Sequence, residues 1–212
     1  MSTSIFPNSQ LYGTGYCALF VRGISPAELL TRVSGREIQP VPLTRLEVDA
    51  VKAPLGEDID EDDVPELNVD ELHSSGMLDN SGPLLRAGTH NDWSFVIESE
   101  GPYLASDEII AAASRDTVAL SARLSETGST WISYAENSEI LSSFDPLFPQ
   151  HDHGKRPATL EELTGFREAI DSGNRSEAYE NAVRKIQQEL QCAVPQEADA
   201  ARLLAVRVAG GY

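Results

Sequence analysis

The sequence has few of the features that would place a chain outside a reducing compartment or in a membrane. Only two cysteines occur among 212 residues, Cys17 and Cys192, and each lies in an apolar neighbourhood far from the other. We therefore expect buried free thiols rather than a disulfide framework. No stretch approaches the roughly 20 apolar residues of a membrane span, and the first residues lack the basic start and apolar run of a signal peptide. These absences predict a cytoplasmic protein that does not bind membranes.

Positive charge is also scarce. The chain has 16 lysines and arginines against 34 aspartates and glutamates, which gives a net charge of -18. Such a field repels phosphate backbones and anionic lipid, so nucleic acid is not an expected partner. An acidic surface favours encounter with a basic protein, although an excess of acids also serves solubility alone.

The short motifs of common catalytic and cofactor sites are absent. Residues 12–15 (YGTG) have two glycines but neither the third glycine nor the lysine of a phosphate loop. A calcium loop starting at Asp58 would have Asp63 instead of glycine at its sixth position and Val69 instead of glutamate at its twelfth. Cys17 lies in an apolar run and is more typical of a core residue than of a nucleophile. We assign no cofactor and no catalytic residue, and whether the chain is an enzyme stays open.

Apolar runs and turn signals predict an α+β fold. Residues 16–22 (YCALFVR) are typical of a buried strand, and Ser25 and Pro26 then suit the N-cap and first position of a helix that ends at Gly35. An irregular strand is expected between Ile38 and Lys52. Further strands are predicted at 93–98, 117–124, 130–135 and 139–144, the last three as an antiparallel meander, with a second capped helix from Ser106.

The C-terminal part has a helical pattern. Apolar residues recur every three or four positions over 160–170 and 179–190, and a third helix is expected from Glu197 to Val208. We predict an antiparallel or mixed sheet covered by helices, with a sheet domain over residues 1–157 and a helical segment, 158–212, packed on the same domain.

One segment concentrates the acids. Nine of the fifteen residues from Glu57 to Glu71 are acidic and none is basic, so mutual repulsion and missing apolar mass disfavour a packed element. We expect a loop that contacts a basic partner. The candidate partner-binding residues are Asp58, Asp60, Glu61, Asp62 and Asp63.

Two further groups are candidate sites. Trp93, Trp131 and Tyr134 are expected on neighbouring strands, where they could form a ligand platform or pack in the core. His151 and His153 have the H-x-H spacing that can hold a divalent metal, with Asp145 or Asp152 as a third ligand, but the pair also suits a polar loop.

Four segments together carry a resemblance to a known family. They are residues 16–26 (YCALFVRGISP), 93–98 (WSFVIE), 133–136 (SYAE) and 143–146 (SFDP). With these, the chain resembles an uncharacterised family of actinobacterial proteins over roughly residues 14–200, with the acidic segment as an insertion. The resemblance implies a shared fold and an actinobacterial origin, and it transfers no catalytic residue.

The sequence thus predicts a non-catalytic protein-binding module, of a toxin-neutralising or regulatory kind, that uses its acidic surface. The alternative is a small-molecule-binding or metal-binding accessory protein, or an enzyme, with a pocket near Trp93, Trp131, His151 and His153. A structural component of a larger assembly is a third possibility, and the oligomeric state is not predicted.

Overall fold

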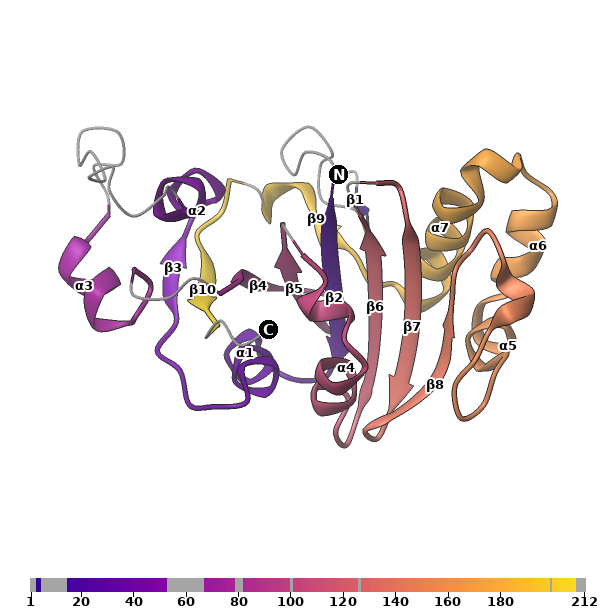
Figure 1. The fold of residues 1–212 in the computed structure, drawn as a ribbon, viewed down its shortest axis with the longest axis horizontal. Helices are drawn as coiled ribbons and strands as arrows, with labels where there is room; N and C mark the ends of the chain where they lie inside the picture. Colours follow the sequence, from indigo (N-terminus) through magenta and orange to yellow (C-terminus); the bar gives the residue numbers. More distant parts are fainter. Residues whose placement is uncertain are drawn as a thin grey trace.

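An antiparallel sheet of eight strands forms the centre of the fold (Figure 1). The computed structural model describes residues 3–4, 15–52, 67–78, 82–99, 101–125, 127–198 and 200–208. The strand order is β3-β10-β4-β5-β2-β6-β7-β8, and every pair of neighbours is antiparallel. The bounds are β2 (Tyr16–Arg22), β3 (Val41–Leu43), β4 (Leu84–His90), β5 (Trp93–Glu98), β6 (Val118–Leu124), β7 (Thr130–Glu136), β8 (Glu139–Phe144) and β10 (Leu203–Arg207). A separate two-stranded sheet pairs β1 (Thr3–Ser4) with β9 (Val194–Pro195).

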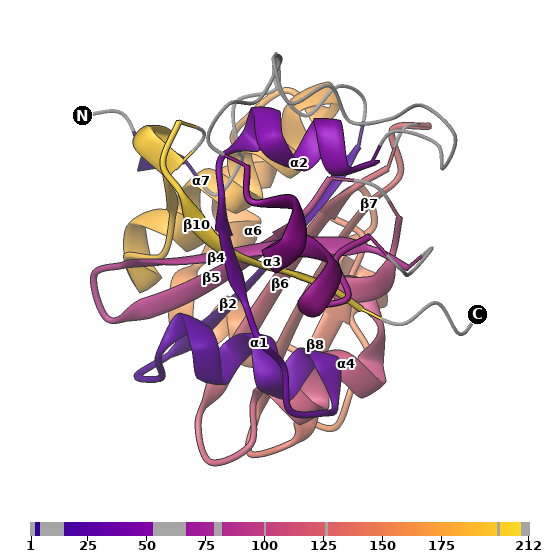
Figure 2. The same cartoon turned by 90° about the vertical axis from the view of Figure 1, so that its left-hand side faces the viewer.

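Helices cover the sheet in three groups. They are α1 (Pro26–Ser34), α2 (Arg45–Lys52), α3 (Val69–Ser74), α4 (Asp107–Ala113), α5 (Thr159–Thr164), α6 (Phe166–Asp171) and α7 (Ala178–Leu190). Short 3₁₀ turns lie at η1 (Tyr103–Ala105), η2 (Pro149–His151), η3 (Arg175–Glu177) and η4 (Gln196–Ala198). Helices α5, α6 and α7 pack on one face of the sheet, η1, α1 and α4 on the other, and α2 with α3 against β3 and β10 (Figures 1 and 2). The α+β class with an antiparallel sheet is therefore confirmed.

The central position of strand β2 explains why its sequence is apolar at consecutive residues rather than at every second one. The strand lies between β5 and β6 in the middle of the sheet, so both of its faces are covered. Ala18 and Phe20 pack into the core under α5–α7, whereas Cys17 and Leu19 pack under α1 and α4. The prediction of a buried strand is confirmed. The expectation of buried free thiols is confirmed as well, because Cys17 and Cys192 are both free and fully buried.

Helix α1 begins and ends where its capping residues predict. The Ser25 side chain accepts a hydrogen bond from the Glu28 amide at 3.2 Å, and Pro26 occupies the first position of the helix. Gly35 ends the helix in the left-handed conformation, with φ 65°. Because these signals are local, the sequence locates the helix correctly.

Two predicted elements are wrong, and the acidic loop expected over residues 57–71 ends earlier than predicted, because helix α3 begins at Val69. Residues 203–207 form strand β10 between β3 and β4 instead of the expected third C-terminal helix. Residues 45–52 form helix α2, and only Val41–Leu43 of the expected irregular strand is extended. In both cases the apolar pattern is too short to distinguish the helical period of 3.6 residues from the strand period of two. None of the described helices is both long and apolar enough to cross a lipid bilayer.

Candidate functional site

The register of the sheet aligns four side chains of very different chemistry. Cys17 of β2 lies opposite Glu98 of β5 on one side and opposite Arg123 of β6 on the other, and Arg123 lies opposite Trp131 of β7. Directly paired residues point to the same face of a sheet. The four therefore form one row on the face that η1, α1 and α4 partly cover.

Turn η1 fixes the position of Glu98. The Leu104 amide donates a hydrogen bond to Glu98 Oε2 at 3.0 Å, and the Tyr103 amide donates to the same carboxyl group. The Tyr103 hydroxyl in turn donates to the Val33 carbonyl at the end of α1. Since Glu98 is only 2 % exposed, its carboxyl group is held in one place rather than moving with solvent.

Gly101 keeps space open beside this carboxyl group. Its φ is +91°, in the region that favours glycine, and a Cβ at this position would lie 2.8 Å from Glu98 Oε1. Gly101 and Glu98 both line a pocket of about 880 Å³. A side chain at residue 101 would therefore fill the part of the pocket next to Glu98.

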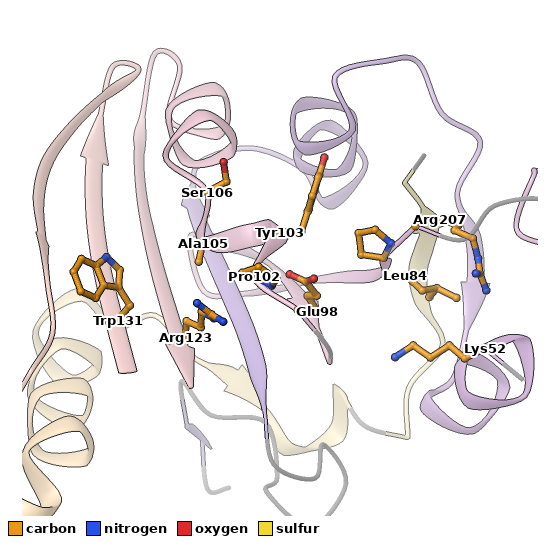
Figure 3. A pocket seen from close by; sticks show the side chains of 13 residues that line it. Lys52, Leu84, Glu98, Pro102, Tyr103, Ala105, Ser106, Arg123, Trp131 and Arg207 are labelled. Carbon is orange, nitrogen blue, oxygen red and sulfur yellow. The ribbon is translucent and has the colours of Figure 1, made fainter. Parts of the chain in front are cut away.

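Three cationic side chains line the same pocket (Figure 3). Arg123 comes from β6, Lys52 from the last turn of α2 and Arg207 from β10. Lys52 Nζ hydrogen-bonds the Ser99 hydroxyl, and Arg207 Nη2 donates to the Val51 carbonyl at 2.9 Å. Among the described residues, no hydrogen bond or ion pair joins the Arg123 guanidinium to another residue.

Glu98 titrates near neutrality. Burial raises the pKa of this carboxyl group from 4.5 to about 7. The amide hydrogen bonds from η1 and the positive charges of Arg123 and Lys52 act in the opposite direction but only partly offset burial. Glu98 can therefore exchange a proton near pH 7, as a general acid or base must.

The rest of the pocket wall is largely apolar. Leu84, Pro83, Pro102, Ala105 and Trp131 contribute to it. The pocket is within the size range of small-molecule sites, which combine apolar walls with a few placed polar groups. Its chemistry suits a small organic molecule whose negative charge meets the cationic side chains.

A model of a family of unknown function, DUF6461, matches residues 6–209. The chain belongs to this family. No curated protein and no solved structure matches it. The resemblance to an uncharacterised family is confirmed, and the actinobacterial origin stays a prediction.

In this member of DUF6461 the three candidate aromatic residues lie on two faces of the sheet. Trp131 lines the pocket, and its indole N–H donates to the Ser143 hydroxyl at 2.8 Å. Trp93 and Tyr134 instead pack into the core on the opposite face, where the Trp93 indole N–H donates to the Leu190 carbonyl at 3.0 Å. The structure therefore does not bring the three together.

The two candidate histidines contact different aromatic rings. The His151 ring stacks on Phe148, with ring centroids 6.2 Å apart, whereas the His153 ring lies 5.7 Å from that of Trp131. The Asp152 carboxylate accepts hydrogen bonds from the backbone amides of Ser143 and Ala158. Within the described ranges, no group of three or more metal-binding side chains occurs.

The candidate partner-binding acids Asp58, Asp60, Glu61, Asp62 and Asp63 lie outside the described residues. Sequence reasoning in turn missed Lys52, Glu98, Arg123 and Arg207. A signal was present for two of them, because Glu98 and Arg123 are the only charged residues in strands that are mostly apolar. A charge at an inward position of a strand is costly unless it is paired or functional.

Proposed function

We propose that this protein binds a small organic anion with an apolar body in the pocket around Glu98. The observation that carries the proposal is the gathering of Lys52, Arg123 and Arg207 on one mostly apolar cavity of about 880 Å³. A pocket of this kind provides charge complementarity for the anionic group and contact area for the remainder of the ligand.

The charge of the whole chain makes this gathering informative. Acids outnumber bases by 34 to 16, yet the described charged residues that line the pocket are three cations and one carboxylate. Among the described lining residues, the balance of charge is therefore opposite in sign to the net charge of -18. An anion is repelled by most of the protein and attracted by this cavity, which favours selective binding there.

Trp131 supports an apolar or aromatic ligand body. Its indole N–H donates to the Ser143 hydroxyl and its ring lies beside the His153 ring, and these two contacts hold the side chain in the pocket wall. A tryptophan fixed in this way offers a flat apolar surface next to Arg123, its cross-strand neighbour.

A fluorescence titration tests the proposal. The probe is 8-anilinonaphthalene-1-sulfonate, which joins an anionic group to aromatic rings and becomes fluorescent in apolar sites. We expect Arg123→Gln to weaken probe binding at least fivefold at low salt, and Arg115→Gln, a change at an exposed arginine outside the pocket, to leave binding unchanged. Circular dichroism checks that both variants are folded. Equal probe affinity in the two variants would refute the proposal.

A second proposed function uses the acidic segment. Nine acids in the fifteen residues from Glu57 to Glu71 carry half of the net charge of -18, and such a concentration speeds association with a basic surface. We propose this segment as the contact for a basic protein partner, in a toxin-neutralising or regulatory role. Neither proposed function excludes the other.

A further inference from the structure

We infer that the ligand of this pocket carries two separate anionic groups, one bound at Arg123 and the other at Lys52 and Arg207, on opposite sides of Glu98. The inference rests on the proposed anion-binding function and names the class of anion. It follows from the placement of the charges, from the fixed position of Glu98 and from the space beyond Arg123.

The cationic side chains approach Glu98 from opposite directions. Arg123 and Glu98 belong to one register row, with β2 between their strands, so their Cα atoms are roughly 10 Å apart. Figure 3 shows Arg123 extending toward Glu98 from the side of β6, and Lys52 extending toward it from the side of α2. Arg207 belongs to the Lys52 side, because its guanidinium binds the carbonyl of Val51, the residue before Lys52.

Glu98 divides this cationic lining into two parts. Its carboxyl group accepts hydrogen bonds from the amides of η1, which hold it in the pocket lining between the cations. An anionic group at the centre of the pocket would lie against the buried Glu98 carboxylate, and repulsion between two like charges is stronger where burial lowers the local dielectric. Anionic groups are therefore favoured at the two ends, where each meets a cation and is separated from Glu98.

There is also space for a group at Arg123. A second cavity of about 340 Å³ adjoins the pocket and shares Gly101 and Arg123 with it. Ser125 and Thr127 also line this cavity. Hydroxyl groups can hydrogen-bond an oxyanion that the Arg123 guanidinium holds.

A competition experiment tests the inference at pH 8, where Glu98 is mostly ionised. Adipate, pimelate and suberate, and the monocarboxylates of equal length, hexanoate, heptanoate and octanoate, are titrated against the bound fluorescent sulfonate. We expect the best dicarboxylate to compete at least tenfold better than its monocarboxylate. Arg123→Gln should reduce this preference to less than threefold, while Arg115→Gln should retain it.

The pH dependence adds an independent readout. Among the described residues, the charged or titratable groups that face Glu98 or line the pocket with it are Arg123 from β6, Lys52 from α2, Arg207 from β10, Tyr103 from η1 and Cys17 from β2. The pKa of the Cys17 thiol is raised by burial to about 12, so below pH 8 it stays neutral. At pH 6 Glu98 is mostly protonated and no longer repels a central anion. The preference for dicarboxylates should therefore fall between pH 8 and pH 6.

Failure of this inference differs from failure of the proposed function. If Arg123→Gln weakens binding of the sulfonate but dicarboxylates and monocarboxylates compete equally, or neither competes, the anion site stands and the inference of two anionic groups is wrong. If Arg123→Gln has no effect on sulfonate binding, the anion site itself is wrong.

Discussion

Replacement of Glu98 by glutamine should change how the stability of the protein depends on pH. The pKa of Glu98 is about 7 in the folded protein and 4.5 when the carboxyl group is exposed to water. Between these values the folded state binds the proton and the unfolded state does not, so the free energy of unfolding falls as pH rises, by about 1.4 kcal/mol per pH unit. The full difference in pKa corresponds to a loss of about 3 kcal/mol.

This loss should be absent from Glu98→Gln, because an amide does not titrate. Urea unfolding of wild type and variant, followed by circular dichroism at several pH values, gives the difference in their free energies of unfolding. We expect that difference to shift in favour of the variant by about 3 kcal/mol between pH 4.5 and pH 8. Hydrogen bonds that glutamine loses or gains around η1 add an offset that is the same at every pH, so the slope carries the test.

An exposed carboxylate provides the matched control. Glu108→Gln on α4 removes one acid without touching the pocket, and its stability should remain parallel to that of wild type across the range. If Glu98→Gln and wild type were also parallel, burial would not be raising the pKa of Glu98. The electrostatic reasoning for the pocket would then be refuted.

Three other changes test the fold and the second proposed function. Arg86 is buried, and its guanidinium donates to the carbonyls of residues 198 and 201 at 2.9 Å each. Arg86→Met should therefore lower the free energy of unfolding by about 3 kcal/mol. The control, Arg184→Met on the exposed side of α7, should change it by less than about 0.5 kcal/mol. A Cβ on Gly88 would lie 2.7 Å from the buried Phe95 ring, so Gly88→Ala should destabilise the protein by about 1–3 kcal/mol in urea unfolding, and an unchanged midpoint would contradict the packing described for β4. Replacing acids of the acidic segment by neutral residues should slow association with a basic partner captured from a native lysate and make the association rate less dependent on salt. Surface plasmon resonance measures this rate. An unaltered association rate would remove the segment from the second proposal. The residues to change are Asp60, Glu61, Asp62 and Asp63.

Local signals in the sequence determined the elements that it predicted well. The N-cap and C-cap of α1 lie within three or four residues of the groups they satisfy, and the apolar face of α7 recurs over thirteen residues. Such patterns depend on neighbours along the chain, so no knowledge of the fold is needed to recognise them. The buried thiols, too, could be predicted from their apolar surroundings.

Long-range pairing decided what the sequence left open or predicted wrongly. Leu203–Arg207 has a pattern that also suits a helix, but its backbone pairs with Val41–Leu43 and with Leu84–Ala87, more than a hundred residues earlier in the chain. Hydrogen bonds to both neighbours stabilise the strand over the alternative helix, and nothing local to residues 203–207 indicates them.

The candidate site is decided in the same way. Lys52, Glu98, Arg123 and Arg207 belong to separate elements, and no spacing between them in the sequence forms a motif. The sequence by itself determined that the chain is acidic, that its core is α+β and where several helices and strands begin. Only the register of the sheet and the packing of α2 against it bring three cations around one buried carboxylate, because contacts between distant residues are set by the tertiary structure and not by their order in the chain.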